Sequence, residues 1–259
     1  MPSSSIQIAP GAQPFFFPGD STGILIIHGY GGSIGDYRDF GNQLHRFGYT
    51  VMGMRLAGHG QNLPILKQAT IADWQQSVDE AIDHIRQQCQ NIVIVGSSFG
   101  GVLALDAVRR KKTIHGLVVV NTALSYRGGG AMQGFLLRLL RLFTPYYPKF
   151  GMSGAERRRG REVGSSPAWP INGILATAKF SRQNIIPVLP TIQIPVLIVS
   201  SSNDPIVGTE NGSVLIANLG STIKSTIVVP VATHRPFRDI AATAFLAEQT
   251  HAFIQQHLA

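Results

Sequence analysis

A serine at position 98 lies in the segment Gly96-Ser97-Ser98-Phe99-Gly100, which has the pattern of a nucleophile site. The apolar run 92–95 before it predicts a buried strand, and the sequence after it is typical of a helix. Gly-x-Ser-x-Gly between a strand and a helix predicts a turn so tight that its flanking positions must lack side chains. Such a turn presents the Ser98 hydroxyl above the end of the strand, where a base can reach it. We therefore expect Ser98 to act as a nucleophile, with Ser97 beside it in the site.

The nucleophile needs a carboxylate further along the chain. A serine hydroxyl reacts poorly at neutral pH unless a base takes its proton, and that base needs an orienting acid. Asp204 lies three residues after the apolar run 195–201, where a loop at the carboxyl end of a strand is expected. Asn-Asp-Pro is also good turn chemistry, so a structural role is the alternative. Asn121 holds the rival position after the preceding strand, but its amide cannot carry the required charge, which favours Asp204.

A histidine that follows the acid is the expected base. Among the eight histidines, His234 is the one that lies after Asp204 in a loop at the end of a predicted strand, residues 226–231. His28 and His59 lie in glycine-flanked loops before the nucleophile, which is the wrong chain order for the base. The other five fall on predicted helices or at a strand start.

The negative charge that forms on a tetrahedral intermediate requires N–H donors that are already in place. One expected donor is the backbone N–H of Phe99, directly after the nucleophile. The other is the backbone N–H of Tyr30, in the loop His28-Gly29-Tyr30-Gly31-Gly32 that ends the first predicted strand. His28-Gly29 could be a simple turn, but the two glycines after Tyr30 favour a backbone held close to another group.

Strands and helices that alternate along the chain must position these residues. Strands are predicted at 23–28, 50–56, 92–95, 115–121, 195–201 and 226–231, with helices near 36–47, 71–88, 99–110, 210–219 and 238–258. This alternation predicts an α/β fold with a mostly parallel central sheet and helices on both faces. Residues 125–185 carry no clear strand and interrupt the pattern. We expect one core, formed by residues 1–124 and 186–259, with a functional insertion at 125–185.

Several motifs in this order resemble the α/β-hydrolase superfamily. They are HGYGG at 28–32, GHG at 58–60, GSSFGG at 96–101 and SNDPIV at 202–207, followed by the histidine near the C-terminus. Their order and spacing are most similar to those of bacterial carboxylesterases and monoacylglycerol lipases. The resemblance implies an α/β-hydrolase fold in which the insertion forms a mainly helical cap or lid.

The same resemblance implies roles for individual residues. Ser98, Asp204 and His234 would form the catalytic triad, with Tyr30 and Phe99 as oxyanion donors. The positions expected to shape or support the substrate pocket are His28, Gly29, Gly31, His59 and Ser97. Two departures leave the acyl preference open: Phe99 stands where a Met or Leu is common and is expected to narrow the pocket wall, and Arg235-Pro236 follows the histidine where an aliphatic residue is common.

The function implied is that of a serine hydrolase that cleaves carboxylic esters through an acyl-enzyme intermediate. Short- to medium-chain acyl esters or monoacylglycerol-like lipids are the expected substrates. An acyltransferase or thioesterase with the same triad stays open, and a non-catalytic carrier of hydrophobic ligands is disfavoured because all three catalytic positions are filled. No cofactor or metal is expected, because the sequence has no His-x-x-x-His, no cysteine pair and no phosphate-binding GxxxxGK[ST] motif.

The insertion contains a segment, residues 135–143, that is apolar except for Arg138 and Arg141. On a helix these arginines share one face, opposite a broad Leu/Phe stripe. Two interpretations stay open: a cap helix that packs on the core, or an access surface for lipid-like substrates that makes transient contact with a membrane. Gly128-Gly129-Gly130 before it could act as a hinge.

Composition excludes several classes of protein. The chain has 259 residues, of which 44% are hydrophobic and 14% charged, which is typical of a globular rather than a disordered protein. The single cysteine, Cys89, excludes an intrachain disulfide. Twenty-two basic residues against 14 acidic ones give a net charge of +8, but no base-reading module indicates nucleic acid. No run of about 18 apolar residues or secretory signal is evident, so a cytoplasmic location is expected, while the oligomeric state stays open.

Overall fold

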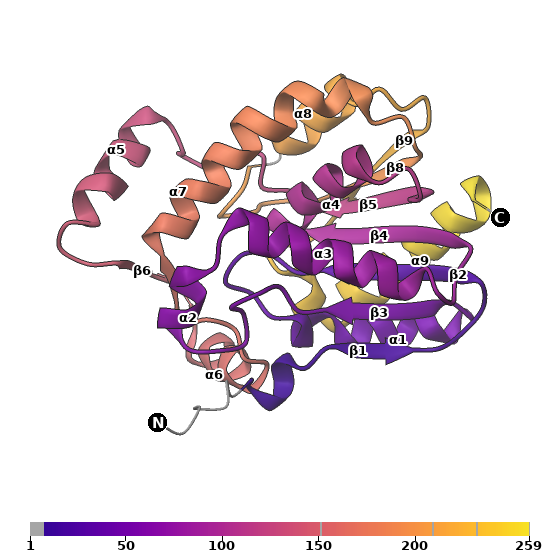
Figure 1. Cartoon of the computed structure of the whole chain (residues 1–259), viewed down its shortest axis with the longest axis horizontal. Coiled ribbons are helices and arrows are strands. Elements are labelled where there is room, and N and C mark those ends of the chain that lie inside the picture. The colour runs from indigo at the N-terminus through magenta and orange to yellow at the C-terminus, as the bar shows by residue number, and fades with distance from the viewer. Residues whose placement is uncertain (1–7, 151, 209, 232, 259) are drawn as a thin grey trace.

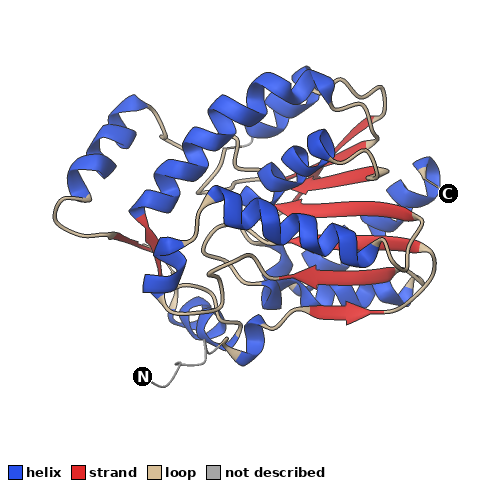
Figure 2. Ribbon diagram, in the orientation of Figure 1, coloured by secondary structure: helices blue, strands red, loops and turns tan. Residues whose placement is uncertain are grey.

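A mostly parallel sheet of seven strands organises the chain in the computed structural model, which describes residues 8–150, 152–208, 210–231 and 233–258. The strand order is β1-β3-β2-β4-β5-β8-β9 (Figure 2). The strands are β1 (Phe15–Phe17), β2 (Thr22–Ile27), β3 (Thr50–Met54), β4 (Asn91–Ser97), β5 (Gly116–Val120), β8 (Val196–Ser201) and β9 (Lys224–Val229). β1 pairs antiparallel with β3, and the other neighbouring strands pair in parallel.

Helices cover both faces of the sheet, as predicted (Figure 1). The helices α1 (Arg38–Arg46) and α9 (Ile240–His257) pack on one face, and α3 (Ile71–Ile85), α4 (Phe99–Arg110) and α8 (Glu210–Asn218) pack on the other. The side chains of β2 alternate between the two cores: Ile24 and Ile26 belong to the first, and Leu25 and Ile27 to the second. Burial on both faces explains why the strand is continuously apolar. The predicted fold class is confirmed.

The direction in which strands are added reverses between β2 and β4. From β2 the chain runs outward to β3, and then returns to place β4 on the other side of β2. The loops that leave the carboxyl ends of these two strands diverge there and leave a crevice, which is where open parallel sheets bind ligands. Ser98 follows β4 and the His28–Gly32 loop follows β2, so the topology brings these two motifs together.

The segment inserted after β5 contains three helices and a short ribbon. Its elements are α5 (Ala131–Leu140), β6 (Tyr146–Pro148), α6 (Gly154–Glu162), β7 (Ala168–Pro170) and α7 (Ile171–Phe180). The ribbon corrects the expectation that residues 125–185 hold no strand. β6 and β7 pair antiparallel over three residues each, with Tyr147 opposite Trp169. Strands of three residues that end in proline are too short to show an alternating pattern.

Short elements complete the described chain, and α5 differs from its prediction. The short segments are α2 (Leu63–Gln68), the 3₁₀ helices Pro10–Ala12, Ile34–Tyr37, Ile186–Thr191 and Pro236–Arg238, and a π-helical turn at Ser181–Ile185. α5 starts at Ala131 and ends at Leu140, whereas the sequence pattern indicates a helix at 135–143. It stands away from the sheet (Figure 1), and none of its side chains is fully buried. Most of its apolar residues are therefore exposed, whereas Leu137 and Leu140 are half-buried.

Membrane crossing is not supported by any described helix. None in the described ranges combines the length and the apolar character that a membrane span requires.

Candidate active site

The turn at Ser98 adopts the strained geometry that the glycine spacing predicts. Ser98 has φ 56° and ψ −122°, between the end of β4 and the first residue of α4. A Cβ atom at Gly96 would lie 2.5 Å from the Gly100 carbonyl oxygen, and one at Gly100 would overlap the Ile27 carbonyl oxygen. Both positions therefore require glycine, because the backbones of β2, β4 and α4 come too close for a side chain.

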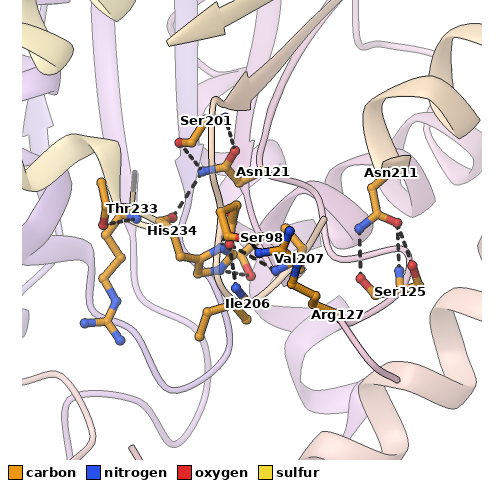
Figure 3. Close-up of polar contacts among 12 residues, drawn as sticks. Ser98, Asn121, Ser125, Arg127, Ser201, Ile206, Val207, Asn211, Thr233 and His234 are labelled. Atoms are coloured by element: carbon orange, nitrogen blue, oxygen red, sulfur yellow. Dashed lines mark hydrogen bonds and ion pairs between the residues drawn. The ribbon is translucent and has the colours of Figure 1, made fainter. Parts of the chain in front are cut away.

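Ser98, His234 and Asp204 form one hydrogen-bonded chain. The Nε2 atom of His234 lies 2.9 Å from the Ser98 Oγ atom (Figure 3). Its Nδ1 atom lies 2.6 Å from Asp204 Oδ2. The other oxygen of Asp204 accepts hydrogen bonds from the backbone N–H groups of Ile206, at 2.8 Å, and Val207, at 3.0 Å. These two donors fix the buried carboxylate. The arrangement can pass a proton from the hydroxyl to the imidazole while the carboxylate stabilises the imidazolium.

The rival acid position, Asn121, holds the histidine loop instead. Its side-chain amide donates to the Ser201 hydroxyl at 2.8 Å and to the His234 carbonyl oxygen at 3.3 Å, and its Oδ1 atom accepts from the Ser201 N–H at 2.7 Å (Figure 3). Asn121 also has a positive φ of 46°, which asparagine tolerates better than most residues. It therefore links the ends of β5 and β8 to the loop that carries His234.

The two expected oxyanion donors flank Ser98. Phe99 is the first residue of α4, so its N–H has no partner within the helix. Within the described parts of the chain, neither this N–H nor that of Tyr30 donates a hydrogen bond. A Cβ atom at Gly29 would lie 2.9 Å from the Ser98 Cβ atom. The Tyr30 loop thus runs directly against the serine, and neither N–H group has a partner among the described residues that would compete with an oxyanion.

Two buried histidines form hydrogen bonds that hold the loop that carries Tyr30. His28 Nδ1 donates to the Gly29 carbonyl oxygen at 3.0 Å, and its Nε2 atom accepts from the Leu56 N–H at 3.2 Å. His59 Nε2 accepts from the Gly31 N–H at 2.9 Å, while its Nδ1 atom lies 3.1 Å from the Ala57 carbonyl oxygen. Burial lowers the pKa of His28 to about 4. It also lowers the pKa of His59 well below its usual value, so both rings are neutral and accept through Nε2.

A cavity of about 340 Å³ opens above Ser98, between the core and the inserted segment. Of the predicted pocket residues, Gly29 and Ser97 line it, whereas His28, Gly31 and His59 are not among the lining residues. Its apolar and aromatic lining includes Tyr126, Leu137, Trp169, Ile174, Ile206 and Phe237.

The expectation that Phe99 narrows the cavity wall is not met. Its side chain is absent from the lining, and its ring packs against Trp74 and Phe180 in the core. A residue at the start of a helix can direct its side chain away from the backbone N–H that faces the site. The sequence motif predicts the position of the Phe99 backbone N–H but not the direction of its side chain.

Lys149 and Trp169 are site residues that the sequence did not single out. The Nζ atom of Lys149 donates to the Gly31 carbonyl oxygen at 2.7 Å and lies 5.0 Å from the centre of the Trp169 ring. Burial lowers the pKa of Lys149 well below its usual value, and the nearby Arg235 and Arg238 lower it further. In the sequence Lys149 was one of many basic residues of the insertion, and no pattern distinguished it. In the described ranges no group of three or more His, Cys, Asp or Glu side chains could hold a metal ion.

Comparison with known proteins finds a matching family and similar sequences. The sequence model of the family described as serine aminopeptidase, S33, matches residues 21–241. A thermostable monoacylglycerol lipase from Bacillus sp. (strain H-257) is 32% identical over 141 residues, which are 52% of this chain and 56% of the lipase. A carboxylesterase from Bacillus subtilis (strain 168) is 24% identical over 207 residues, 78% of this chain and 80% of the esterase.

Solved structures share the fold. A structure from a study of the metagenome-derived lipolytic enzymes LipS and LipT has a TM-score of 0.85 and 26% identity, and the alignment covers 97% of this chain and 100% of that chain. A monoacylglycerol lipase from Paleococcus ferrophilus has a TM-score of 0.76 and 17% identity, with 94% of this chain and 98% of that chain aligned.

Proposed function

The chain belongs to the family described as serine aminopeptidase, S33, and on that premise we propose that it is a serine hydrolase that cleaves carboxylic esters. The observation that carries the proposal is the hydrogen-bonded chain of Ser98, His234 and Asp204 beneath a largely apolar cavity. The relatives named as a monoacylglycerol lipase and a carboxylesterase support an ester substrate. The neighbours aligned over nearly the whole chain include lipolytic enzymes, which supports the same reaction.

The reaction proceeds through an acyl-enzyme. His234 Nε2 takes the proton from Ser98 Oγ, which attacks the ester carbonyl carbon. The N–H groups of Tyr30 and Phe99 stabilise the oxyanion that forms. The imidazolium then gives its proton to the alkoxide oxygen as the carbon–oxygen bond breaks, and the alcohol leaves. A water molecule, deprotonated by His234, attacks the acyl carbon and returns Ser98 with release of the carboxylic acid.

The cavity supports substrates of modest size. A volume of about 340 Å³ lies at the lower end of the range for small-molecule sites, and the lining near Ser98 is mainly apolar and aromatic. Short- to medium-chain acyl esters or monoacylglycerol-like lipids match these dimensions. Residues 125–185 serve as the cap, because Leu137, Lys149, Trp169 and Ile174 close one side of the cavity.

The exposed side of the cap supports transient contact with a lipid surface. Phe135 and Leu136 on α5 are each 54% exposed, and Phe143 just beyond the helix is 88% exposed. Arg138 lies on the same helix and is also exposed. Apolar side chains mixed with cations on one surface favour binding at the interface of an anionic membrane.

The test of the reaction is loss of turnover when the nucleophile is removed. Ser98→Ala should lower kcat for p-nitrophenyl butyrate on the order of 10⁶-fold, because a triad without its nucleophile keeps only residual catalysis. A fluorophosphonate probe should label the wild type and not this variant. Ser202→Ala, in an exposed turn, serves as the matched control and should retain both properties. Turnover that survives in Ser98→Ala would contradict the proposal. Acyl transfer would be revealed by formation of a new ester when alcohols are added to the wild type.

A further inference from the structure

Cationic side chains outnumber acidic ones on the cavity wall. Arg127, Lys149 and Arg235 line the cavity, against a single carboxylate, that of Asp36. Both oxygens of Asp36 already accept from the Arg238 guanidinium, each at 2.9 Å. This bidentate pair neutralises the one acidic group of the wall. The cavity therefore carries positive charge that its own carboxylate does not balance.

Lys149 is a buried cation without a counter-ion. The residue is 7% exposed, and its ammonium forms no ion pair with any residue in the described ranges. Among the described residues its one hydrogen bond goes to the carbonyl oxygen of Gly31, although an ammonium group can donate three. Burial of an unpaired charge is costly, and the lowered pKa of Lys149 reflects that cost. An anion in the cavity would supply the missing partner.

Arg235, which directly follows His234 in the histidine loop, also lacks a counter-ion among the described residues. Its guanidinium has no hydrogen bond or ion pair with any described side chain or backbone group, and burial lowers its pKa. Arg235 and Lys149 both line the cavity, so both cations can face the same bound group. A guanidinium presents a planar set of donors that matches a carboxylate or a phosphate.

We propose that the cavity recognises an ester that carries an anionic group, a carboxylate or a phosphate, held by Lys149 and Arg235 beside Ser98. This inference rests on the proposed hydrolysis at Ser98 and narrows its substrate class. The apolar portion of the lining, formed by Leu137, Ile174 and Ile206, receives the hydrocarbon part of the substrate. The reacting carbonyl lies between these two regions, at Ser98.

A purely structural role for Lys149 makes a different prediction. Its bond to Gly31 joins the cap to the loop that carries Tyr30, so its loss could disturb catalysis in general. A structural effect would lower turnover of neutral and anionic esters alike. Recognition of an anion would instead change the ratio of the two rates.

The experiment compares kcat/KM for two matched pairs of substrates. One pair is 1-octanoylglycerol and 1-octanoylglycerol 3-phosphate, and the other is p-nitrophenyl pentanoate and the p-nitrophenyl half-ester of glutaric acid. We expect the wild type to prefer the anionic member of at least one pair by about tenfold or more, as one charge-assisted contact provides. The pair in which the anionic member is preferred identifies whether a phosphate or a carboxylate is the group bound.

Variants then assign the preference to the two cations. Arg235→Gln and Lys149→Met should each reduce the anionic-to-neutral ratio by about tenfold. Arg182→Gln removes the same charge from an exposed position outside the cavity and should leave the ratio unchanged. Calorimetric binding of 1-octanoylglycerol 3-phosphate and of the glutarate half-ester to Ser98→Ala provides a readout that needs no turnover.

The outcomes separate this inference from the proposed function. One outcome is that neutral esters are hydrolysed in a Ser98-dependent manner while neither anionic ester is preferred over, or bound more tightly than, its neutral counterpart. In that case the inference is wrong and the proposed function stands. Ratios that are equal in the wild type, Arg235→Gln and Lys149→Met would also overturn it. If no ester is hydrolysed at Ser98, the proposed function fails, and this inference falls with it.

Discussion

The side-chain amide of Asn121 donates a hydrogen bond to the His234 carbonyl oxygen across 3.3 Å, and so fixes the histidine loop to the end of β5. The same amide exchanges hydrogen bonds of 2.8 and 2.7 Å with Ser201 at the end of β8. Asn121 takes up a left-handed conformation to do this. It acts on the imidazole through the backbone, whereas Asp204 contacts the ring.

Replacement of Asn121 by alanine should impair both stability and activity. The variant loses buried hydrogen bonds and keeps an unfavourable positive φ, so we expect the free energy of unfolding to fall by about 3 kcal/mol. A displaced His234 loop should lower kcat about tenfold, with a smaller effect on KM. Urea denaturation and steady-state kinetics with p-nitrophenyl butyrate measure the two effects.

Asn121→Gly is the matched control, because glycine adopts the positive φ without strain. It should recover about 1 kcal/mol of stability relative to Asn121→Ala and still show the loss in kcat. Wild-type kcat in the glycine variant would mean that the amide does not position His234.

The sequence predicted the features that local physics determines. Gly96 and Gly100 are required by backbone contacts around Ser98, and the apolar strands by burial on both faces. The carboxyl ends of the parallel strands meet at one edge of the sheet, which brings together the loops that carry Ser98, Asp204 and His234. These requirements leave a pattern within a few residues of the chain, so they are readable before the structure.

Features that depend on the path of the inserted segment were not predictable. Lys149 contacts Gly31 across 118 positions of the sequence, and Trp169 packs on the same glycine. Nothing near either residue encodes that contact. The exposure of α5 was also open, because a Leu/Phe stripe fits a buried face and a lipid-facing one equally well.

Gly29→Ala should reduce activity strongly with little effect on folding. The added methyl would lie 2.9 Å from the Ser98 Cβ atom and 3.3 Å from its Oγ atom, so it would displace the hydroxyl from His234. We expect kcat/KM for p-nitrophenyl butyrate to fall roughly 10²-fold, the usual cost of misplacing a reacting atom by about 1 Å. Gly130→Ala has no atom within 4 Å of the added methyl and should keep wild-type kinetics. Equal rates in the two variants would show that Gly29 does not set the serine geometry.

The neutral state of His28 predicts a loss of stability in acid. Its pKa is about 4 in the folded protein and 6.5 as a free side chain, so the unfolded chain binds the additional proton between these values. The full contribution of neutral His28 to the free energy of unfolding is therefore present above pH 6.5. As the pH falls toward 4, protonation of His28 in the unfolded chain lowers this free energy by about 3 kcal/mol in total.

His28→Gln tests this assignment, because it keeps a hydrogen-bond acceptor and removes the titration. Urea denaturation at pH 7 and pH 4 should show that the stability advantage of the wild type shrinks by about 3 kcal/mol in acid. The difference between the two proteins is the readout, because acidic groups such as Asp73 and Glu156, with lowered pKa values, also lose stabilisation in acid. Stability curves that run parallel over this range would contradict the neutral assignment of His28.

The apolar surface of the cap should bind anionic lipid vesicles. Leu142 is 73% exposed and Phe143 is 88% exposed, so replacing both with serine removes apolar area that packs on nothing else. We expect the partition coefficient onto phosphatidylglycerol vesicles, measured by sedimentation, to fall at least about tenfold, because each side chain contributes on the order of 1 to 2 kcal/mol of apolar transfer.

The control replaces Val228 and Ile240, which are exposed on β9 and at the start of α9, and should bind vesicles as the wild type does. Hydrolysis of soluble p-nitrophenyl acetate should be the same in all three proteins, since the changed positions lie outside the cavity lining. Equal vesicle binding by the cap variant and the control would assign the exposed apolar residues to another role.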